Sequence, residues 1–191
     1  MDKASGPQTI YVIRHAEKPD ESRPGSVPRG VDESGERSID SLTPRGWQRA
    51  GALAPFFGGD RTTAPAGPTP TALLAPDYGK DTPVHRSAET LAPLSRRLGI
   101  AVETPAAKGS EGDLVSQVLG KDGHVLVCWE HHRIADIVAA LGQAVALGPL
   151  PDLAASWPDN IFDQVLVFTR SAGGYTAAAV PQRLLDGDSG T

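Results

Sequence analysis

Short apolar runs alternate with amphipathic stretches along this chain. Runs of apolar and β-branched residues that stop at polar residues are typical of buried strands. Two late runs, 163–169 and 175–180, flank the sequence SAGG and are expected to form a closing hairpin. The pattern predicts earlier strands at 9–14, 71–75, 100–103 and 124–129.

The stretches between these runs predict helices, and capping residues mark where they begin and end. Thr43 followed by Pro44 is a helix start, and Gly99 is a helix stop. Strands and helices in alternation form a mostly parallel sheet with helices on both faces, so we expect a three-layer α/β/α sandwich. The predicted helices cover 44–57, 85–98, 111–119 and 134–141.

Two polar segments lie outside the predicted strands and helices. Residues 18–41 are rich in Gly and Pro and form a longer connection than a compact domain normally needs. Such a segment is typical of a lid, of a substrate-facing loop or of a disordered stretch. The tail from Asp186, with the sequence DGDSGT, is expected to be frayed.

Composition limits the function classes. The 191 residues carry a net charge of −5, which indicates neither nucleic-acid binding nor an anionic membrane partner. The length fits one domain over residues 1–191 with a core at about 9–180. The one cysteine, Cys128, lies in an apolar run and is expected to be a buried thiol. We expect a cytoplasmic protein, because no signal peptide or membrane span is recognisable.

Candidate chemistry begins where the first strand ends. Arg14 and His15 directly follow buried strand positions, and ionisable groups rarely occur there without a partner or a function. A solvated strand exit is the plain alternative. The carboxyl end of a strand is, however, where open α/β sheets bind their ligands, so an active site is the leading hypothesis.

Two further segments supply partners. Arg86 stands in the first turn of a predicted helix, where backbone N–H groups favour an anion. His131 and His132 follow the strand VLVCW. Arginine matches phosphate oxygens in a bidentate way, and neutral imidazole is a competent nucleophile. Together these residues predict phosphoryl transfer through His15.

The order of motifs resembles a known family. RHAEKP, then LTPRGWQRA, then HRSAET, then a strand ending before histidine occur in the order of the histidine phosphatase superfamily, also called phosphoglycerate mutase-like. The resemblance runs from about residue 9 to 169. It implies a phosphoglycerate mutase-like fold with His15 as the phosphate-accepting nucleophile. It also implies that Arg14, Arg86 and His131 bind the phosphate.

The chain departs from the family at the second histidine. Glu130 replaces the usual small residue before it, and His132 follows it, so either His131 or His132 could bind the phosphate. The general acid also stays open. The short 102–121 segment offers Glu111 and Asp113, and the acid-phosphatase branch takes its acid from the position of His132. The remaining candidates beside the motifs are Glu17 and Glu130.

Three functions are consistent with these residues. The first is a metal-independent phosphatase acting on a phosphate monoester or phosphoprotein through a phosphohistidine intermediate, with no cofactor. The second is a metallohydrolase with ligands among His15, Glu17, His131 and His132, although no recognised metal-binding spacing supports it. The third is a phosphate- or phosphoprotein-binding module without turnover. A phosphoglycerate mutase is disfavoured because 102–121 leaves little chain to cover the site.

Overall fold

The central feature of the fold is a mixed sheet. The computed structural model describes residues 6–20, 22, 28–59, 67–79 and 84–188. Over these ranges the chain forms a six-stranded sheet in the order β3-β2-β4-β1-β5-β6. β1 to β4 are parallel and β5 is antiparallel to both neighbours, which confirms the mostly parallel sheet and the closing hairpin. The strands are β1 (Thr9–Arg14), β2 (Ala72–Leu74), β3 (Val102–Glu103), β4 (His124–Trp129), β5 (Gln164–Ser171) and β6 (Gly174–Pro181).

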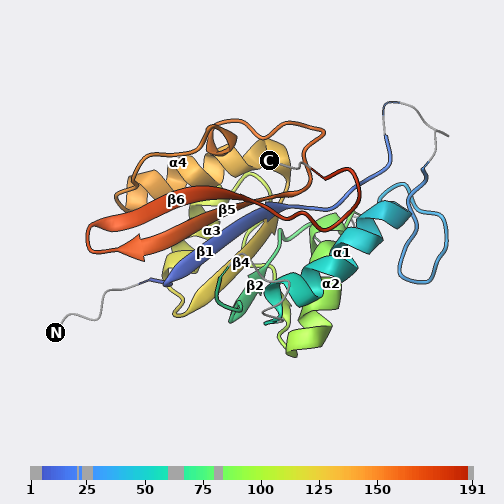
Figure 1. The fold of residues 1–191 in the computed structure, drawn as a ribbon, viewed down its shortest axis with the longest axis horizontal. Helices are drawn as coiled ribbons and strands as arrows, with labels where there is room; N and C mark the ends of the chain where they lie inside the picture. Colours follow the sequence, from blue (N-terminus) through green and yellow to red (C-terminus); the bar gives the residue numbers. More distant parts are fainter. Residues whose placement is uncertain (1–5, 21, 23–27, 60–66, 80–83, 189–191) are drawn as a thin grey trace.

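Helices cover both faces of this sheet (Figure 1). Side chains alternate along β1, so Val12 packs with α3 and α4 whereas Tyr11 packs with α1 and α2. The three-layer α/β/α sandwich is therefore confirmed. The helices are α1 (Pro44–Phe57), α2 (Arg86–Leu98), α3 (Glu111–Leu119) and α4 (Ile134–Ala144), with short 3-10 turns η1 (His131–Arg133) and η2 (Asp152–Ala154). No helix in the described ranges has the length and apolar content needed to cross a membrane.

Local sequence explains where α1 begins and how closely it packs. The Thr43 Oγ1 atom accepts a hydrogen bond from the Gly46 backbone N–H at 3.1 Å, and Pro44 occupies the first helical position. A Cβ atom at Gly46 would lie 2.3 Å from the Glu17 carbonyl oxygen, so only glycine fits there. The first turn of α1 thus lies directly against the chain that leaves β1.

Element boundaries differ from the predictions by a few residues. Helix α4 continues past Leu141 to Ala144, and β2 and β3 are shorter than the apolar runs at 71–75 and 100–103. β3 lies at the sheet edge, and both of its residues pair with β2, which is itself only three residues long.

The long polar segment packs against the helices where the structure describes it. The Val31 N–H donates to the Leu42 carbonyl at 2.9 Å, and the Trp47 Nε1 atom donates to the Val31 carbonyl at 2.8 Å. Arg86 donates to the Ile39 carbonyl at 2.7 Å. Residues 21 and 23–27 of this segment lie outside the described ranges. The described part therefore reaches Arg86, and a substrate-facing role for it stays a prediction.

The prediction of a frayed tail is wrong as far as Asp188. The Asp188 side chain is only 4% exposed and lies 2.6 Å from the Arg49 Nη2 atom, and Arg49 is itself 3% exposed. Asp188 also accepts hydrogen bonds from the N–H groups of Leu184 and Leu185. A buried guanidinium needs several acceptors, and Glu17 at 2.9 to 3.1 Å and Gln182 at 3.1 Å supply the others. Residues 189–191 lie outside the described ranges.

This network leads to a stability prediction. Arg49→Ala would leave the Glu17 and Asp188 carboxylates partly buried without their guanidinium, so unfolding free energy should fall by about 3–5 kcal/mol. Arg45→Ala is the matched control, because Arg45 contacts the same two carboxylates but is 43% exposed. It should cost no more than about 1 kcal/mol. Urea denaturation measures both, and equal losses would contradict the buried role of Arg49.

Candidate active site

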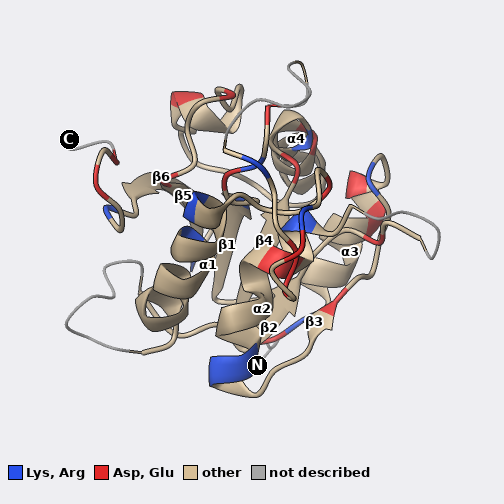
Figure 2. Ribbon diagram, turned by 90° about the vertical axis from the view of Figure 1, so that its right-hand side faces the viewer, with Lys and Arg blue, Asp and Glu red and all other residues tan. Residues whose placement is uncertain are grey.

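The ends of two neighbouring strands create the candidate site. Arg14 pairs with Trp129 in the β1–β4 register, and the His15 N–H donates to the Trp129 carbonyl at 3.1 Å. From β1 the chain crosses over β4 to β2, whereas from β4 it crosses over β1 to β5. The site is therefore at the point where strand order reverses, a common ligand-binding position in such sheets. Figure 2 shows acidic and basic segments close together in the view along this edge.

His15 lies at the base of the site in a defined tautomer. Its side chain Nδ1 atom is 2.8 Å from the Ala16 carbonyl oxygen, and the residue is 3% exposed. A carbonyl can only accept, so Nδ1 carries the proton and Nε2 carries the free lone pair. Burial, together with the charges of Arg14 and Arg86, lowers the pKa of His15 to about 3. His15 is thus a neutral imidazole with an available Nε2 atom.

Thr90 connects His15 to the second arginine helix. The Ala16 N–H donates to the Thr90 Oγ1 atom at 2.9 Å, and the Thr90 hydroxyl donates to the Arg86 carbonyl at 2.7 Å. This pair of bonds joins the end of β1 to the first turn of α2. Arg86, 6% exposed, is consequently held close enough to His15 for its charge to lower the His15 pKa.

Arg14 is buried and holds a distant loop. Its Nη1 atom donates to the carbonyl oxygens of Pro158, Asp159 and Ile161 at 3.1, 2.8 and 3.0 Å. The Phe162 ring lies 3.8 Å from its guanidinium carbon. Burial lowers the pKa of Arg14 to about 10, so it stays a cation at neutral pH. Its Nε atom is buried and has no hydrogen-bond partner within the described part of the chain.

His131, and not His132, lies beside these groups. The Arg14 Nη2 atom is 3.3 Å from His131 Nδ1, and since arginine can only donate, Nδ1 is the acceptor. His131 Nε2 therefore carries the proton and donates to Asp159 Oδ1 at 2.7 Å. Burial and Arg14 lower the pKa of His131. The His131 and His15 rings are 6.1 Å apart, whereas the His132 side chain is 65% exposed.

The acids predicted from the sequence are mostly used in ion pairs. Glu111 lies 2.8 Å from Arg133 and accepts from the Trp129 indole. Burial raises the pKa of Glu111, but the bonds from Arg133, Gly109 and Trp129 outweigh it and lower the pKa to about 2. Glu17 is bound by Arg49, and Glu130 lies 3.2 Å from Lys108 and 3.4 Å from His131 Nδ1. Asp113 is exposed on α3.

Asp159 was not among the sequence candidates. It lies in an irregular segment between η2 and β5, and neither periodicity nor a motif marks it. Its side chain is 81% exposed, yet Oδ1 lies 2.7 Å from His131 Nε2 and 3.6 Å from His132 Nε2. The structure thus adds one carboxylate to the group formed by Arg14, His15 and His131.

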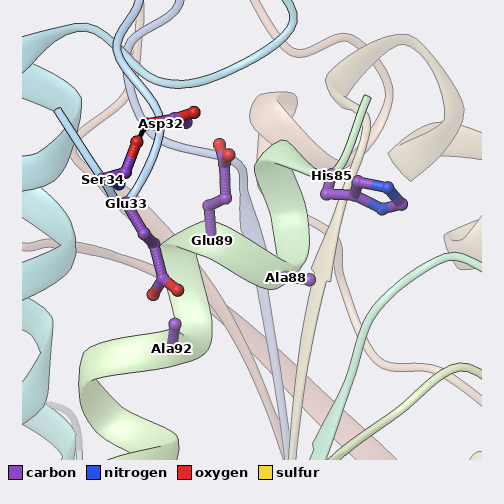
Figure 3. A pocket seen from close by; sticks show the side chains of 7 residues that line it. All are labelled: Asp32, Glu33, Ser34, His85, Ala88, Glu89 and Ala92. Atoms are coloured by element: carbon purple, nitrogen blue, oxygen red, sulfur yellow. Dashed lines mark hydrogen bonds between the residues drawn. The ribbon is translucent and has the colours of Figure 1, made fainter. Parts of the chain in front are cut away.

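A cavity of about 400 Å³ lies along α2. In Figure 3 the Glu89 side chain projects from α2 towards the neighbouring loop. Glu89 accepts from the Leu42 N–H at 3.1 Å, and burial raises its pKa. The lining residues are Asp32, Glu33, Ser34, His85, Ala88, Glu89 and Ala92. This lining is rich in acid, so the groups suited to a phosphate are those at the strand ends instead.

Three described residues could act together as metal ligands. The ligand atoms of Glu130, His131 and His132 lie within 4.8 Å of one another. Both ring nitrogens of His131 already have partners in Asp159 and Arg14. The Arg14 guanidinium, 3.3 Å from Nδ1, would repel a second cation. The set fits a metal poorly.

Solved structures share this fold. The protein named Mycobacterial hydrolase 1 is 16% identical over 93% of this chain and 99% of its own, with a TM-score of 0.52. Mycobacterial glucosyl-3-phosphoglycerate phosphatase Rv2419c, solved with inorganic phosphate, is 14% identical over 91% and 95%, with a TM-score of 0.49. No protein-family model and no curated protein matches the sequence. The likeness to Mycobacterial hydrolase 1 shows that the two chains share a fold, the mixed α/β arrangement described above.

The tautomer and burial of His15 predict its titration. Its folded-state pKa of about 3 lies below the ordinary value of 6.5, so as pH falls the unfolded chain binds the proton first. The stability that neutral His15 contributes is therefore complete above about pH 6.5 and is lost progressively towards pH 3. Nitrogen-15 NMR should show a neutral Nδ1–H ring from pH 7 to below pH 5. A midpoint near 6.5 would contradict this.

Proposed function

We propose that this protein is a metal-independent phosphatase that cleaves a phosphate monoester or phosphoprotein through a phosphohistidine on His15. The observation that carries the proposal is the free Nε2 lone pair of a buried, neutral His15 beside Arg14, Arg86 and His131. The fold shared with solved phosphatases is consistent with it but does not define the reaction.

The arrangement suits an in-line displacement. His15 Nε2 would attack phosphorus while the two guanidinium groups and the His131 Nε2–H bind the equatorial oxygens. These donors are held before substrate arrives, because Arg14 is bonded to a loop and Arg86 to Ile39. Preorganised donors stabilise the charge that develops during transfer. Positive charge from arginine serves the purpose that a metal ion serves in other phosphatases.

The position of α3 favours water over a second substrate hydroxyl as the final acceptor. A mutase must keep water from its phosphoenzyme, which calls for a cover over the site. The chain after α2 is instead used in the core, where Leu114, Val115 and Val118 of α3 pack against the sheet. This segment therefore supports a phosphatase and not a phosphoglycerate mutase.

The phosphoenzyme should be trapped by rapid quenching. During turnover of a phosphorus-32 aryl phosphate, label should appear on His15 in a form that is labile to acid and stable to base. The reaction should run in the presence of a chelator, so a metal-dependent route would be recognised by loss of turnover. His15→Ala should abolish the label and nearly all activity. Label on another residue would contradict the nucleophile, and phosphate binding without turnover would indicate a binding module.

The two arginines should differ sharply from surface arginines in their effect on rate. Arg86→Ala should lower kcat/KM by roughly 10²- to 10³-fold, because one transition-state donor is lost. Arg96→Ala is the matched control: it lies on the same helix, but its side chain is 64% exposed. His131→Ala should be far more damaging than His132→Ala. Less than a roughly fivefold loss for Arg86→Ala would remove it from the site.

A further inference from the structure

The segment 158–161, which is bound by Arg14, places the carboxylate of Asp159 at the solvent-exposed side of the site. Asp159 Oδ1 accepts from His131 Nε2 at 2.7 Å, and the Asp159 backbone carbonyl accepts from Arg14 Nη1 at 2.8 Å. Both bonds come from residues placed in the phosphate site. Asp159 is thereby held at two points, although its side chain is 81% exposed.

The exposures of His15, His131 and Asp159 define a direction from the buried base of the site to solvent. His15 is 3% exposed and forms the base, His131 is 5% exposed and lies next to it, and Asp159 lies at the solvent side of His131. In-line transfer places the leaving oxygen opposite the attacking nitrogen. A phosphoryl group attacked by His15 from below therefore has its leaving oxygen on the side where Asp159 lies.

We propose that Asp159 is the proton donor to the leaving oxygen in the phosphatase reaction, and afterwards the base that activates water. This inference rests on the proposed function. In the first step the His15 Nε2–P bond forms, the P–O bond to the leaving group breaks, and the Asp159 proton goes to the departing oxygen to give an alcohol. In the second step the oxygen of a water molecule attacks phosphorus, and Asp159 takes a proton from that water. The P–N bond breaks, and inorganic phosphate and neutral His15 result.

Substrate binding supplies the protonated form of Asp159. Without substrate, the bond from His131 lowers the pKa of Asp159. A bound phosphate takes over the His131 N–H and sets a second negative charge beside the carboxylate. Loss of a donor and like-charge repulsion both raise the pKa of a carboxyl group. The exposed side chain can then take its proton directly from solvent.

The other acids are worse placed. Glu111 and Glu17 are bound by Arg133 and Arg49, and Glu130 lies on the Nδ1 side of His131 with Lys108. Unlike these three glutamates, Asp159 combines an exposed side chain with a contact to the donor nitrogen of His131.

Leaving-group dependence tests the proposal. A poor leaving group needs a proton donor, whereas p-nitrophenolate leaves without one, and kcat/KM reports all steps through formation of the phosphoenzyme. Asp159→Asn should lower kcat/KM for phenyl phosphate by roughly 10²- to 10⁴-fold and for p-nitrophenyl phosphate by less than about fivefold. Asp159→Glu keeps a carboxyl group and should recover part of the activity towards phenyl phosphate. Asp152→Asn, at an exposed aspartate in η2, should change neither.

The outcomes separate the inference from the function on which it rests. Equal losses on both esters would mean that Asp159 only organises the phosphate site, and no loss on either would mean that it is not involved. Both results overturn the inference, while wild-type turnover with label on His15 leaves the phosphatase intact. Wild-type protein that forms no phosphohistidine under turnover overturns both.

Discussion

The burial of Arg14 next to His15 is the constraint on which the rest of the site depends. A guanidinium in a nearly dry environment must stay charged and must find acceptors. Three carbonyls of the 158–161 segment and the Phe162 ring meet that need. The neighbouring His15 imidazole responds to burial in the opposite way, because it remains neutral. The same buried environment thus contains a charged Arg14 and a neutral His15.

Arginines from the first third of the chain also organise its last third. Arg14 binds the segment before β5, and Arg49 binds Asp188 beyond β6. Glu17, two residues after His15, joins the second of these networks. The carboxyl edge of the sheet is consequently closed on one side by polar contacts between remote segments, while the apolar clusters lie on the two faces of the sheet.

Sequence patterns predicted the elements, and the gathering of the candidate site residues at one edge of the sheet, because each has a local cause. The cap at Thr43 and the apolar runs depend on nearby residues, and Arg14, His15 and His131 follow strands whose neighbours are defined by α/β topology. Asp159 and Asp188 could not be predicted, because their positions depend on contacts 28 and 139 residues away. The pairing of Glu111 with Arg133, 22 residues later, likewise depends on tertiary contact and has no signal in the local sequence.

The triple carbonyl contact of Arg14 also limits how this protein can diverge. A lysine would keep the charge, but its ammonium group lacks the planar arrangement that lets one guanidinium face a loop on one side and a ring nitrogen on the other. Any change that frees Arg14 from the loop also releases the segment carrying Asp159. The 28–41 loop is under a similar constraint through a different arginine, because its Ile39 carbonyl accepts from Arg86.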